Sequence, residues 1–316
     1  MSLSQEISFG KRQNPVVCVV IATYNGATYL PELLASLAAQ RHRPDQIVLR
    51  DDDSSDQSVE LVQKWTALNA ISLQLVKGGR LGPCQSFMCA LKAANSADIY
   101  FFCDQDDVWL PCKISRAVSS VPWGATAQAT LYASRLQVVD ALLKPTRLSA
   151  IPHNLSFASA CCENVLTGCT MAFNERFKQE ITSYLPVSAV MHDWWFYLFA
   201  SAARNTELIY DEEPTLLYRQ HGANVLGAGP IGWTAWWARV CRFFANRRQE
   251  RSVQLAEFNS YHGDLLQIEA SALLNQLLSA KQSIVARLTA SLTSPIKRQT
   301  IISNVTTRIS ILVNRF

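Results

Sequence analysis

The N-terminal part of the chain alternates short apolar runs with amphipathic stretches, and this alternation constrains the fold more than any other feature of the sequence. The apolar runs lie at residues 16–22, 47–49, 73–76 and 99–103. The stretches between them carry apolar residues at helical spacing: one opens at Pro31, and the others cover residues 59–68 and 86–94. Strands that alternate with helices in this way predict an α/β fold with a doubly wound, mostly parallel sheet and right-handed crossovers.

Polar clusters directly follow three of the four apolar runs. They occupy residues 23–25, 51–56 and 104–107. Ligands of doubly wound sheets bind in the crevice beyond the carboxyl ends of the strands. We therefore expect the three clusters to converge on one crevice.

The cluster at 104–107 carries three carboxylates within four residues, Asp104, Asp106 and Asp107. Carboxylates this close repel one another and raise each other's pKa unless a cation lies between them. Oxygen-rich sites suit Mg²⁺ or Mn²⁺, which use one or two carboxylates together with water and phosphate oxygens. The alternative is a solvated acidic turn, and the preceding buried run IYFFC favours the cation site.

The acidic segment at 51–56 has two interpretations that are compatible. Ser54, Ser55 or Asp56 fits the N-cap of the following helix, where acidic residues also suit the helix dipole. Capping by these residues leaves Asp51 and Asp52 available to the crevice.

The rest of the chain divides into two parts. After about residue 125 the alternation fades, and short strand-like pieces surround helices near 175–184 and 193–203. These pieces lie at 130–134, 136–139, 170–173, 208–210 and 216–218. We predict one domain over 15–229, with a doubly wound half at 15–125 and an α+β half at 126–229 that completes the pocket, and a basic helical extension over 230–316.

Composition excludes several classes of protein. Hydrophobic residues make up 49% of the chain and charged residues 17%, which is typical of a globular protein and not of a disordered one. The nine cysteines show no disulfide framework, so a reduced, cytoplasmic compartment is the simpler expectation. No apolar run approaches the roughly 20 residues of a membrane-spanning helix, and no signal-peptide pattern opens the chain.

Six segments together resemble the inverting nucleotide-sugar glycosyltransferases of family 2, which have a GT-A fold. The first three are VVIATYNGATYL at 19–30, RDDDSSD at 50–56 and FFCDQDDVWLPCKI at 101–114. The later segments LTGCTMAFN (166–174), HDWW (192–195) and YRQHGANVLG (218–227) are similar to those of a bacterial subgroup that adds rhamnose or related sugars to surface polysaccharides. The resemblance covers residues 15–227, and the order and spacing of the segments carry it. It implies that the half at 15–125 binds the nucleotide and the half at 126–229 the acceptor.

The resemblance implies roles for individual residues of the donor site. Asp52 would hold the nucleotide base with Asp51 nearby, and Asp104 and Asp106 would form the D-x-D pair that touches the ribose and the Mg²⁺ or Mn²⁺ on the diphosphate. Arg219 and His221 would lie, with Gln220, on a late loop that closes over the diphosphate. The full set expected to bind the nucleotide-sugar is Thr23, Tyr24, Asn25, Asp51, Asp52, Arg80, Asp104, Gln105, Arg219 and His221.

The HDWW segment provides the expected catalytic base. By the resemblance Asp193 deprotonates the acceptor hydroxyl, although an aspartate at this position also fits a helix cap. Trp194 and Trp195 are expected to contact the acceptor sugar, with a core position as the alternative for one of them. His192 and His221 are interpreted as hydrogen-bonded structural groups rather than as a metal site.

The sequence departs from the family pattern at three positions. Asp53 stands where the family usually has glycine, and Arg80 and Ser86 stand where it has asparagine. Arg80 fits either a phosphate contact or a solvated turn. These departures bear on the identity of the donor base more than on the fold.

The C-terminal extension is basic. From residue 230 onward it has 11 Lys and Arg against 4 Asp and Glu. Trp233, Trp236, Trp237 and Phe244 lie at helical spacing with arginines around them, which is typical of a helix on anionic lipid and equally of a helix packed on its own protein. Residues 230–251 are thus a candidate peripheral contact with the cytoplasmic face of a membrane.

The sequence therefore predicts a metal-dependent inverting glycosyltransferase that moves a sugar from a dTDP- or UDP-sugar to a glycan or lipid-linked acceptor of the bacterial surface. One alternative is a noncatalytic nucleotide- or nucleic-acid-binding protein, but an acidic crevice repels nucleic acid, so no nucleic-acid partner is expected. A nucleotidyltransferase is the other alternative, and it would require a basic, glycine-rich loop after the first strand, which Thr23-Tyr24-Asn25-Gly26 does not supply.

Overall fold

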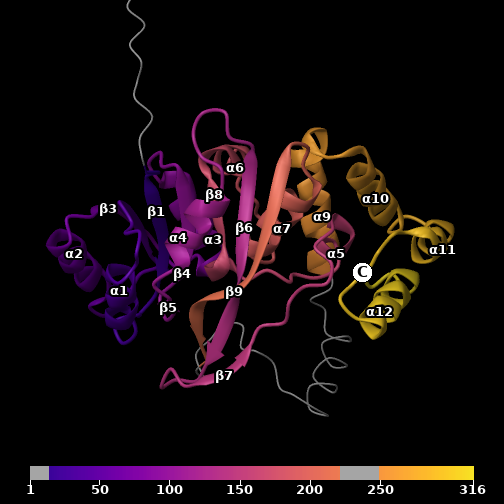
Figure 1. The fold of residues 1–316 in the computed structure, drawn as a ribbon. Helices are drawn as coiled ribbons and strands as arrows, with labels where there is room; N and C mark the ends of the chain where they lie inside the picture. The colour runs from indigo at the N-terminus through magenta and orange to yellow at the C-terminus, as the bar shows by residue number, and fades with distance from the viewer. Residues whose placement is uncertain (1–13, 221–248) are drawn as a thin grey trace, which may run out of the picture.

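A computed structural model describes residues 14–220 and 249–316. Within these ranges the strands form one nine-stranded sheet in the order β3-β2-β1-β4-β8-β6-β9-β5, with β7 paired to β6 (Figure 1). Helices cover both faces of the sheet, as the apolar runs predict for strands buried on both sides. The expected α/β class with a mostly parallel sheet is confirmed.

The N-terminal half of the sheet is parallel and follows the predicted alternation. Its strands are β1 (Val17–Thr23), β2 (Gln46–Asp51), β3 (Ser72–Lys77) and β4 (Ile99–Asp104). The register pairs Thr23 of β1 with Asp51 of β2, and Ala22 with Asp104 of β4. Because paired residues lie side by side, the three polar clusters meet at one edge of the sheet, which confirms their predicted convergence.

The second half of the sheet is mixed. It contains β5 (Val108–Trp109), β6 (Ala129–Val139), β7 (Pro145–Leu148), β8 (Ala172–Asn174) and β9 (Thr206–Arg219). The two strand pieces expected at 130–134 and 136–139 form the single strand β6, and those at 208–210 and 216–218 form β9. The two long strands run parallel, and their register shifts between Ser134 and Arg135, so each strand stays continuous through an irregularity.

Two apolar cores lie on opposite faces of the sheet. One face is covered by α1 (Leu30–Ala38), α2 (Ser58–Leu68) and α4 (Lys113–Ser120). The other is covered by α3 (Gly82–Ala93), α5 (Phe157–Ala160), α6 (Glu175–Ile181) and α7 (His192–Ala202). Helix α3 begins four residues earlier than the sequence pattern indicates, since Gly82 and Pro83 form its first turn.

The C-terminal helices join the second of these cores. They are α9 (Gln249–His262), α10 (Ile268–Ser279), α11 (Ile284–Thr293) and α12 (Ile301–Leu312). Leu273, Leu274 and Leu277 of α10 are buried in that core, so the apolar cluster of this helix packs internally. In the two described ranges no helix combines the length and apolarity needed to cross a membrane.

Candidate functional site

Gln105 joins the end of β4 to the turn after β1. Its Oε1 accepts hydrogen bonds from Thr23 Oγ1 (2.7 Å) and from the backbone N–H of Tyr24 (3.0 Å), and its Nε2 donates to the Tyr24 carbonyl (3.2 Å). A side chain on Gly26 would collide with Gln105 Oε1 and lie 2.9 Å from Thr23 Oγ1. Gln105 therefore holds the crevice edge together, and glycine is needed for the close approach of the turn.

Asn25 fastens the same turn to the acidic segment after β2. Its backbone is in the left-handed region (φ 49°), which asparagine tolerates well. Its N–H donates to Ser54 Oγ (2.9 Å), and its Oδ1 accepts from the Ser55 N–H (2.8 Å). Asn25 lies at the expected edge, where its amide is engaged in joining two loops.

Asp52 is buried and its carboxylate is fully hydrogen-bonded. It accepts from the backbone N–H groups of Leu81 (3.0 Å) and Gly82 (2.8 Å) and from Ser86 Oγ (2.7 Å), and Arg50 forms an ion pair with it at 3.2 Å. These contacts cap helix α3, whose first N–H groups would otherwise lack acceptors. Asp52 thus lies at the carboxyl edge of the sheet as predicted, but its carboxylate is already engaged.

Asp51, unlike Asp52, has a carboxylate oxygen to which no group donates a hydrogen bond among the described residues. Its Oδ2 accepts from the Ser54 N–H at 3.2 Å, whereas its buried Oδ1 has no hydrogen-bond partner among the described residues. A buried, unpaired carboxylate oxygen is costly unless a ligand donates to it. Of the two aspartates, Asp51 is the one poised to accept a hydrogen bond from a ligand.

Tyr24 and Arg80 form a stacked pair at the rim of the crevice. The Arg80 guanidinium carbon lies 4.0 Å from the centre of the Tyr24 ring, and both side chains are exposed. The contact joins the loops after β1 and β3. It presents a planar cationic surface suited to a nucleotide base or to phosphate.

Beneath the crevice edge, two carboxylates and a thiol lie close together. One ligand atom from each of Asp104, Asp107 and Cys169 falls within 4.8 Å of the others. Burial, the neighbouring Asp106 charge and the more distant Asp193 charge raise the pKa of Asp104 to about 7. Asp107 is 1% exposed, and apart from a contact with the Cys169 thiol its carboxylate oxygens have no hydrogen-bond donor among the described residues. Burial and the charges of Asp104 and Asp106 hold the pKa of Asp107 well above its usual value.

Lys113 supplies a positive charge under this cluster. It is completely buried at the start of α4, its Nζ donates to Thr215 Oγ1 at 3.4 Å, and it lies 4.8 Å from the centre of the Trp109 ring. Burial lowers the pKa of Lys113 to about 8, against the opposing effect of the acidic groups around it. One buried lysine does not neutralise three carboxylates, so a further cation would stabilise the cluster.

Asp193, the expected base, is held by three hydrogen-bond donors at the start of α7. Its Oδ1 accepts from Asn164 Nδ2 (2.8 Å) and from the Trp194 N–H (2.7 Å), and its Oδ2 accepts from the Gly168 N–H (3.0 Å). Burial raises the pKa of Asp193 to about 6, although the three bonds oppose this rise. The carboxylate has a fixed orientation and a pKa suited to a base at neutral pH.

His192 is a neutral core histidine, but neither ring nitrogen has a hydrogen-bond partner among the described residues, so the expected hydrogen bonds are absent. Its ring centre lies 4.3 Å from that of Phe87 and 4.8 Å from that of Phe102, and burial lowers the pKa of His192 to about 3. A side chain on Gly168 would collide with His192 Nε2. Glycine at this position therefore lets the 168 backbone reach Asp193.

The two tryptophans of α7 occupy different environments. Trp194 is half-buried, and its Nε1 donates to the Ala160 carbonyl at 2.7 Å. Trp195 is 0% exposed and packs edge-on against Phe258 of α9 with ring centres 5.3 Å apart. We correct the prediction for Trp195, because no sugar can reach a ring enclosed in the core.

Arg219 is buried at the end of β9 and holds the acidic turn in place. Its Nε donates to the Asp106 carbonyl (3.1 Å), its Nη1 donates to the Ala141 carbonyl (2.8 Å), and its Nη2 pairs with Glu32. The guanidinium is engaged with these partners, and its predicted diphosphate contact stays a prediction. His221 and most of the candidate membrane segment 230–251 lie outside the described residues.

Sequence reasoning missed four residues that shape the site: Asn164, Gly168, Cys169 and Lys113. Three of them lie on or beside the segment LTGCTMAFN, so the motif carried a signal that was not resolved into single residues. Lys113 lies in the segment FFCDQDDVWLPCKI, but a lysine in the first turn of a helix is ordinarily exposed, so its residue type did not indicate burial.

Comparisons with known proteins identify a family and several relatives of this chain. Residues 18–147 match the family described as Glycosyl transferase family 2. The chain is 28% identical to the dTDP-rhamnosyl transferase RfbG of Shigella flexneri over 225 residues, which cover 66% of this chain and 74% of that protein. It is also 28% identical to the UDP-Glc:alpha-D-GlcNAc-diphosphoundecaprenol beta-1,3-glucosyltransferase WfaP of Escherichia coli over 212 residues, covering 66% and 79% of the two chains.

A solved structure supports the fold. The crystal structure of residues 1–349 of S. aureus TarS in complex with UDP-GlcNAc superposes with a TM-score of 0.51 over 95% of this chain and 91% of that one, at 16% sequence identity. These findings confirm the predicted family and GT-A fold and identify the chain as a glycosyltransferase. The noncatalytic and nucleotidyltransferase alternatives are thereby set aside.

Proposed function

The chain belongs to glycosyltransferase family 2, and from that premise we propose that it transfers rhamnose or a related hexose, with inversion, from a dTDP- or UDP-sugar to a glycan of the bacterial surface. The observation that carries the proposal is the meeting of Thr23, Asp51 and Asp104 at one sheet edge, together with Asp193, whose charge contributes to the raised pKa of Asp104. This arrangement supports a nucleotide-binding edge with a candidate base near it.

The donor nucleotide would bind along the ends of β1, β2 and β4. Asp51 Oδ1 would accept a hydrogen bond from the base, and Asp52 would act by fixing α3 rather than by direct contact. The stacked pair of Tyr24 and Arg80 would cover one side of the nucleotide. This assignment differs from the one that the family resemblance implied, because the hydrogen bonds of Asp52 are already satisfied.

The acidic cluster fits a divalent cation. The oxygens of buried Asp107, whose only hydrogen-bond donor among the described residues is the Cys169 thiol, and the raised pKa of Asp104 both indicate carboxylates that lack a counter-charge. Asp104 and Asp106 would hold Mg²⁺ or Mn²⁺ at the crevice, with Asp107 supporting them from below. The bound ion would stabilise the negative charge that develops on the departing diphosphate.

Asp193 would remove the proton from the acceptor hydroxyl. At neutral pH the carboxylate is mostly ionised, since its pKa is about 6. A carboxylate is an adequate base because the acceptor attacks a sugar that already resembles an oxocarbenium ion, as in glycoside hydrolysis. Asn164, Gly168 and Trp194 would keep its orientation fixed during the transfer.

The relatives support the donor and the acceptor class. One relative is named for a dTDP-rhamnosyl donor and the other for a UDP-glucose donor with a diphosphoundecaprenol-linked acceptor. By this similarity the acceptor of the present chain would be a growing glycan carried on lipid, and the enzyme would work at the cytoplasmic face of a membrane.

Thermal stability in the presence of nucleotide-sugars tests the proposal. A donor at a hundred times its Kd adds about 2.7 kcal/mol to the free energy of unfolding, which for a chain of 316 residues is a rise of about 4 °C in Tm. We expect dTDP-rhamnose or UDP-glucose to give this rise with Mn²⁺ and a smaller one with EDTA, and GDP-mannose to give none.

Two variants control the metal step. Asp106→Asn should lose the Mn²⁺-dependent part of the rise. Asp53→Asn should keep it, because Asp53 is exposed and its left-handed backbone (φ 71°) tolerates asparagine. If none of the three donors raises Tm and no sugar transfer is detected, the proposed function is wrong.

A further inference from the structure

Helices α11 and α12 expose their apolar stripes to solvent. On α11 the stripe is Ile284, Val285, Leu288 and Leu292, which are 47–75% exposed. On α12 the stripe is Ile301, Ile302, Val305, Ile309 and Leu312, with exposures up to 83%. In each helix these positions fall within about one third of the circumference, so each forms a continuous apolar face.

The opposite faces of the same helices point inward, and apart from Ile311 their buried residues are small or polar. The buried residues of α11 are Ala290 and Ser291, and those of α12 are Thr307, Ser310 and Ile311. Ser291 Oγ donates to the Arg308 carbonyl (3.2 Å), and the Arg308 guanidinium donates back to the carbonyls of Ser291 and Ser294. Helices on the outside of a globular protein normally bury the apolar face, so this pair has the reverse orientation.

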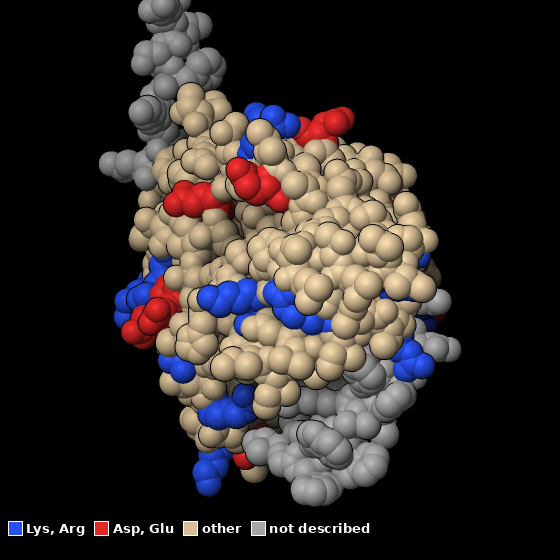
Figure 2. Space-filling model, turned by 90° about the vertical axis from the view of Figure 1, so that its right-hand side faces the viewer, with Lys and Arg blue, Asp and Glu red and all other residues tan. Residues whose placement is uncertain are grey.

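The surroundings of the exposed stripes are cationic. Residues 281–316 contain six Lys and Arg and no Asp or Glu. Figure 2 shows this side of the molecule: a broad uncharged surface with Lys and Arg side chains in a band across its middle, and acidic side chains in its upper part and at the left edge. Arg298 is paired with Glu163, so part of this charge is neutralised. The segment stays positive overall, and exposed apolar residues beside a net positive charge match an anionic lipid surface in both polarity and charge.

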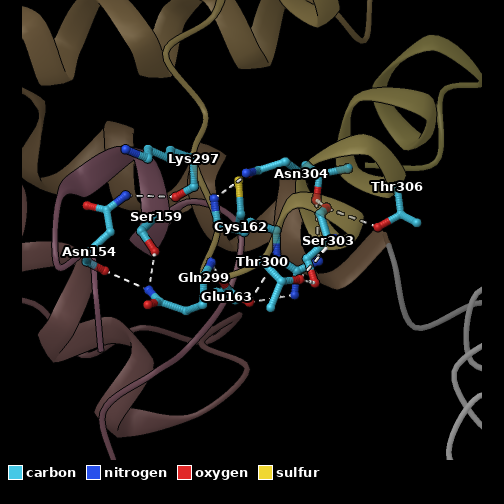
Figure 3. Close-up of polar contacts among 12 residues, drawn as sticks. Asn154, Ser159, Cys162, Glu163, Lys297, Gln299, Thr300, Ser303, Asn304 and Thr306 are labelled. Atoms are coloured by element: carbon cyan, nitrogen blue, oxygen red, sulfur yellow. Dashed lines mark hydrogen bonds and ion pairs between the residues drawn. The ribbon is translucent and has the colours of Figure 1, made fainter. Parts of the chain in front are cut away.

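The helix pair is fixed to the rest of the protein through the loop before α12. Arg298 forms an ion pair with Glu163 at 2.6 Å. Gln299 donates to the Asn154 carbonyl (2.7 Å), and its own N–H donates to Glu163 Oε1 (2.7 Å), as Figure 3 shows. Glu163 directly precedes Asn164, which holds the Asp193 carboxylate. The exposed stripes are therefore connected to the segment that carries the candidate base.

We propose that the solvent-facing stripes of α11 and α12 form a docking surface for an anionic lipid bilayer. A second copy of the chain fits less well, because a two-fold contact through this surface would bring two cationic faces together. The inference is independent of the proposed reaction. Since both helices are short, their apolar faces would lie in the plane of the interface, with the positive side chains at headgroup depth.

Vesicle flotation tests the proposal. The probes are vesicles of equal parts phosphatidylglycerol and phosphatidylethanolamine, and vesicles of phosphatidylcholine alone. We expect the full chain to float with the anionic vesicles at low salt and to bind them less at high salt. The double variant Ile301→Ser, Ile302→Ser should lower the partition coefficient roughly tenfold or more, because two exposed apolar side chains are removed from the contact.

A matched double variant controls for the loss of any exposed leucine or isoleucine. Leu68→Ser with Leu142→Ser removes two side chains that are 77% and 89% exposed elsewhere on the surface, and it should bind vesicles as the natural chain does. Residues 221–248 are the same in all three proteins, so any lipid contact that they make is common to the comparison.

Three results would overturn the proposal. The full chain fails to float with anionic vesicles, or the Ile301, Ile302 variant floats as well as the natural chain. Alternatively, light scattering finds a dimer that this variant dissociates, in which case the surface binds a second copy. Donor binding, read from Tm, is expected to be equal in all three proteins, so failure here leaves the proposed function standing.

Discussion

The substitution Asp193→Asn separates proton transfer from donor binding. The carboxylate accepts three hydrogen bonds, from Asn164, Gly168 and Trp194. An asparagine has only one acceptor oxygen, so its NH₂ group must face at least one of these donors. Leaving a buried donor unpaired costs about 1–3 kcal/mol.

A second effect opposes this cost. Burial raises the pKa of Asp193 from 3.8 to about 6, so between these values the folded chain binds the proton more tightly than the unfolded chain. The free energy of unfolding therefore falls as the pH rises through that window. At pH 7 it is about 3 kcal/mol lower than it would be if Asp193 kept its ordinary pKa. A neutral amide removes that penalty. The two effects offset to within about 2 kcal/mol, and we expect Tm to change by no more than about 5 °C at pH 7.

Activity should respond very differently. Loss of a general base lowers turnover by about 10²–10⁴-fold, while the donor contacts at β1, β2 and β4 stay in place. The assay measures sugar transfer, the nucleotide-dependent Tm rise and the circular dichroism spectrum of one preparation. Turnover within tenfold of the natural chain would refute the role of base, and loss of the donor-dependent Tm rise would show that Asp193 is structural.

Two further predictions follow from the same contacts. The kcat/KM of the natural chain should rise about tenfold per pH unit up to pH about 6 and then level off as Asp193 ionises. The variant Asn164→Ala removes a hydrogen bond that lowers the pKa of Asp193, so the rise in kcat/KM of this variant should end at a higher pH. A pH–rate profile equal to that of the natural chain would contradict the role of Asp193. Gly168→Ala places a methyl group against His192 Nε2, so the free energy of unfolding, measured by thermal unfolding, should fall by about 2 kcal/mol or more. An unchanged Tm would mean that the backbone of residue 168 does not lie against His192 as the structure has it.

The convergence of the polar clusters could be predicted from the sequence, because it depends only on strand order and direction. Residues that end adjacent parallel strands must lie side by side, and the pairs Thr23–Asp51 and Ala22–Asp104 do so. No knowledge of side-chain partners was needed. In the N-terminal half, element boundaries were recovered to within about four residues, since each follows from local periodicity, whereas β6 and β9 were each predicted as two shorter pieces.

The partners of individual side chains could not be predicted in this way. Asp52 was expected to face a ligand, but its acceptors are taken by the first N–H groups of α3, about 30 residues further on. Arg219 was expected on a closing loop, but it reaches back to the Asp106 carbonyl. Such contacts depend on how distant loops approach one another, and neither local propensity nor residue type specifies that approach.

The helices after residue 248 have a consequence for how the chain acquires its structure during synthesis. Trp195 and Phe196 of α7 belong to a core that also contains Phe258 of α9 and Leu274 of α10. Protein synthesis proceeds from the N-terminus at about 5–20 residues per second, so this apolar face of α7 is made several seconds before the helices that cover it. Until then the nascent chain exposes a large hydrophobic surface of the kind that chaperones bind. The core around α7 can therefore form completely only after α9 and α10 have been synthesised.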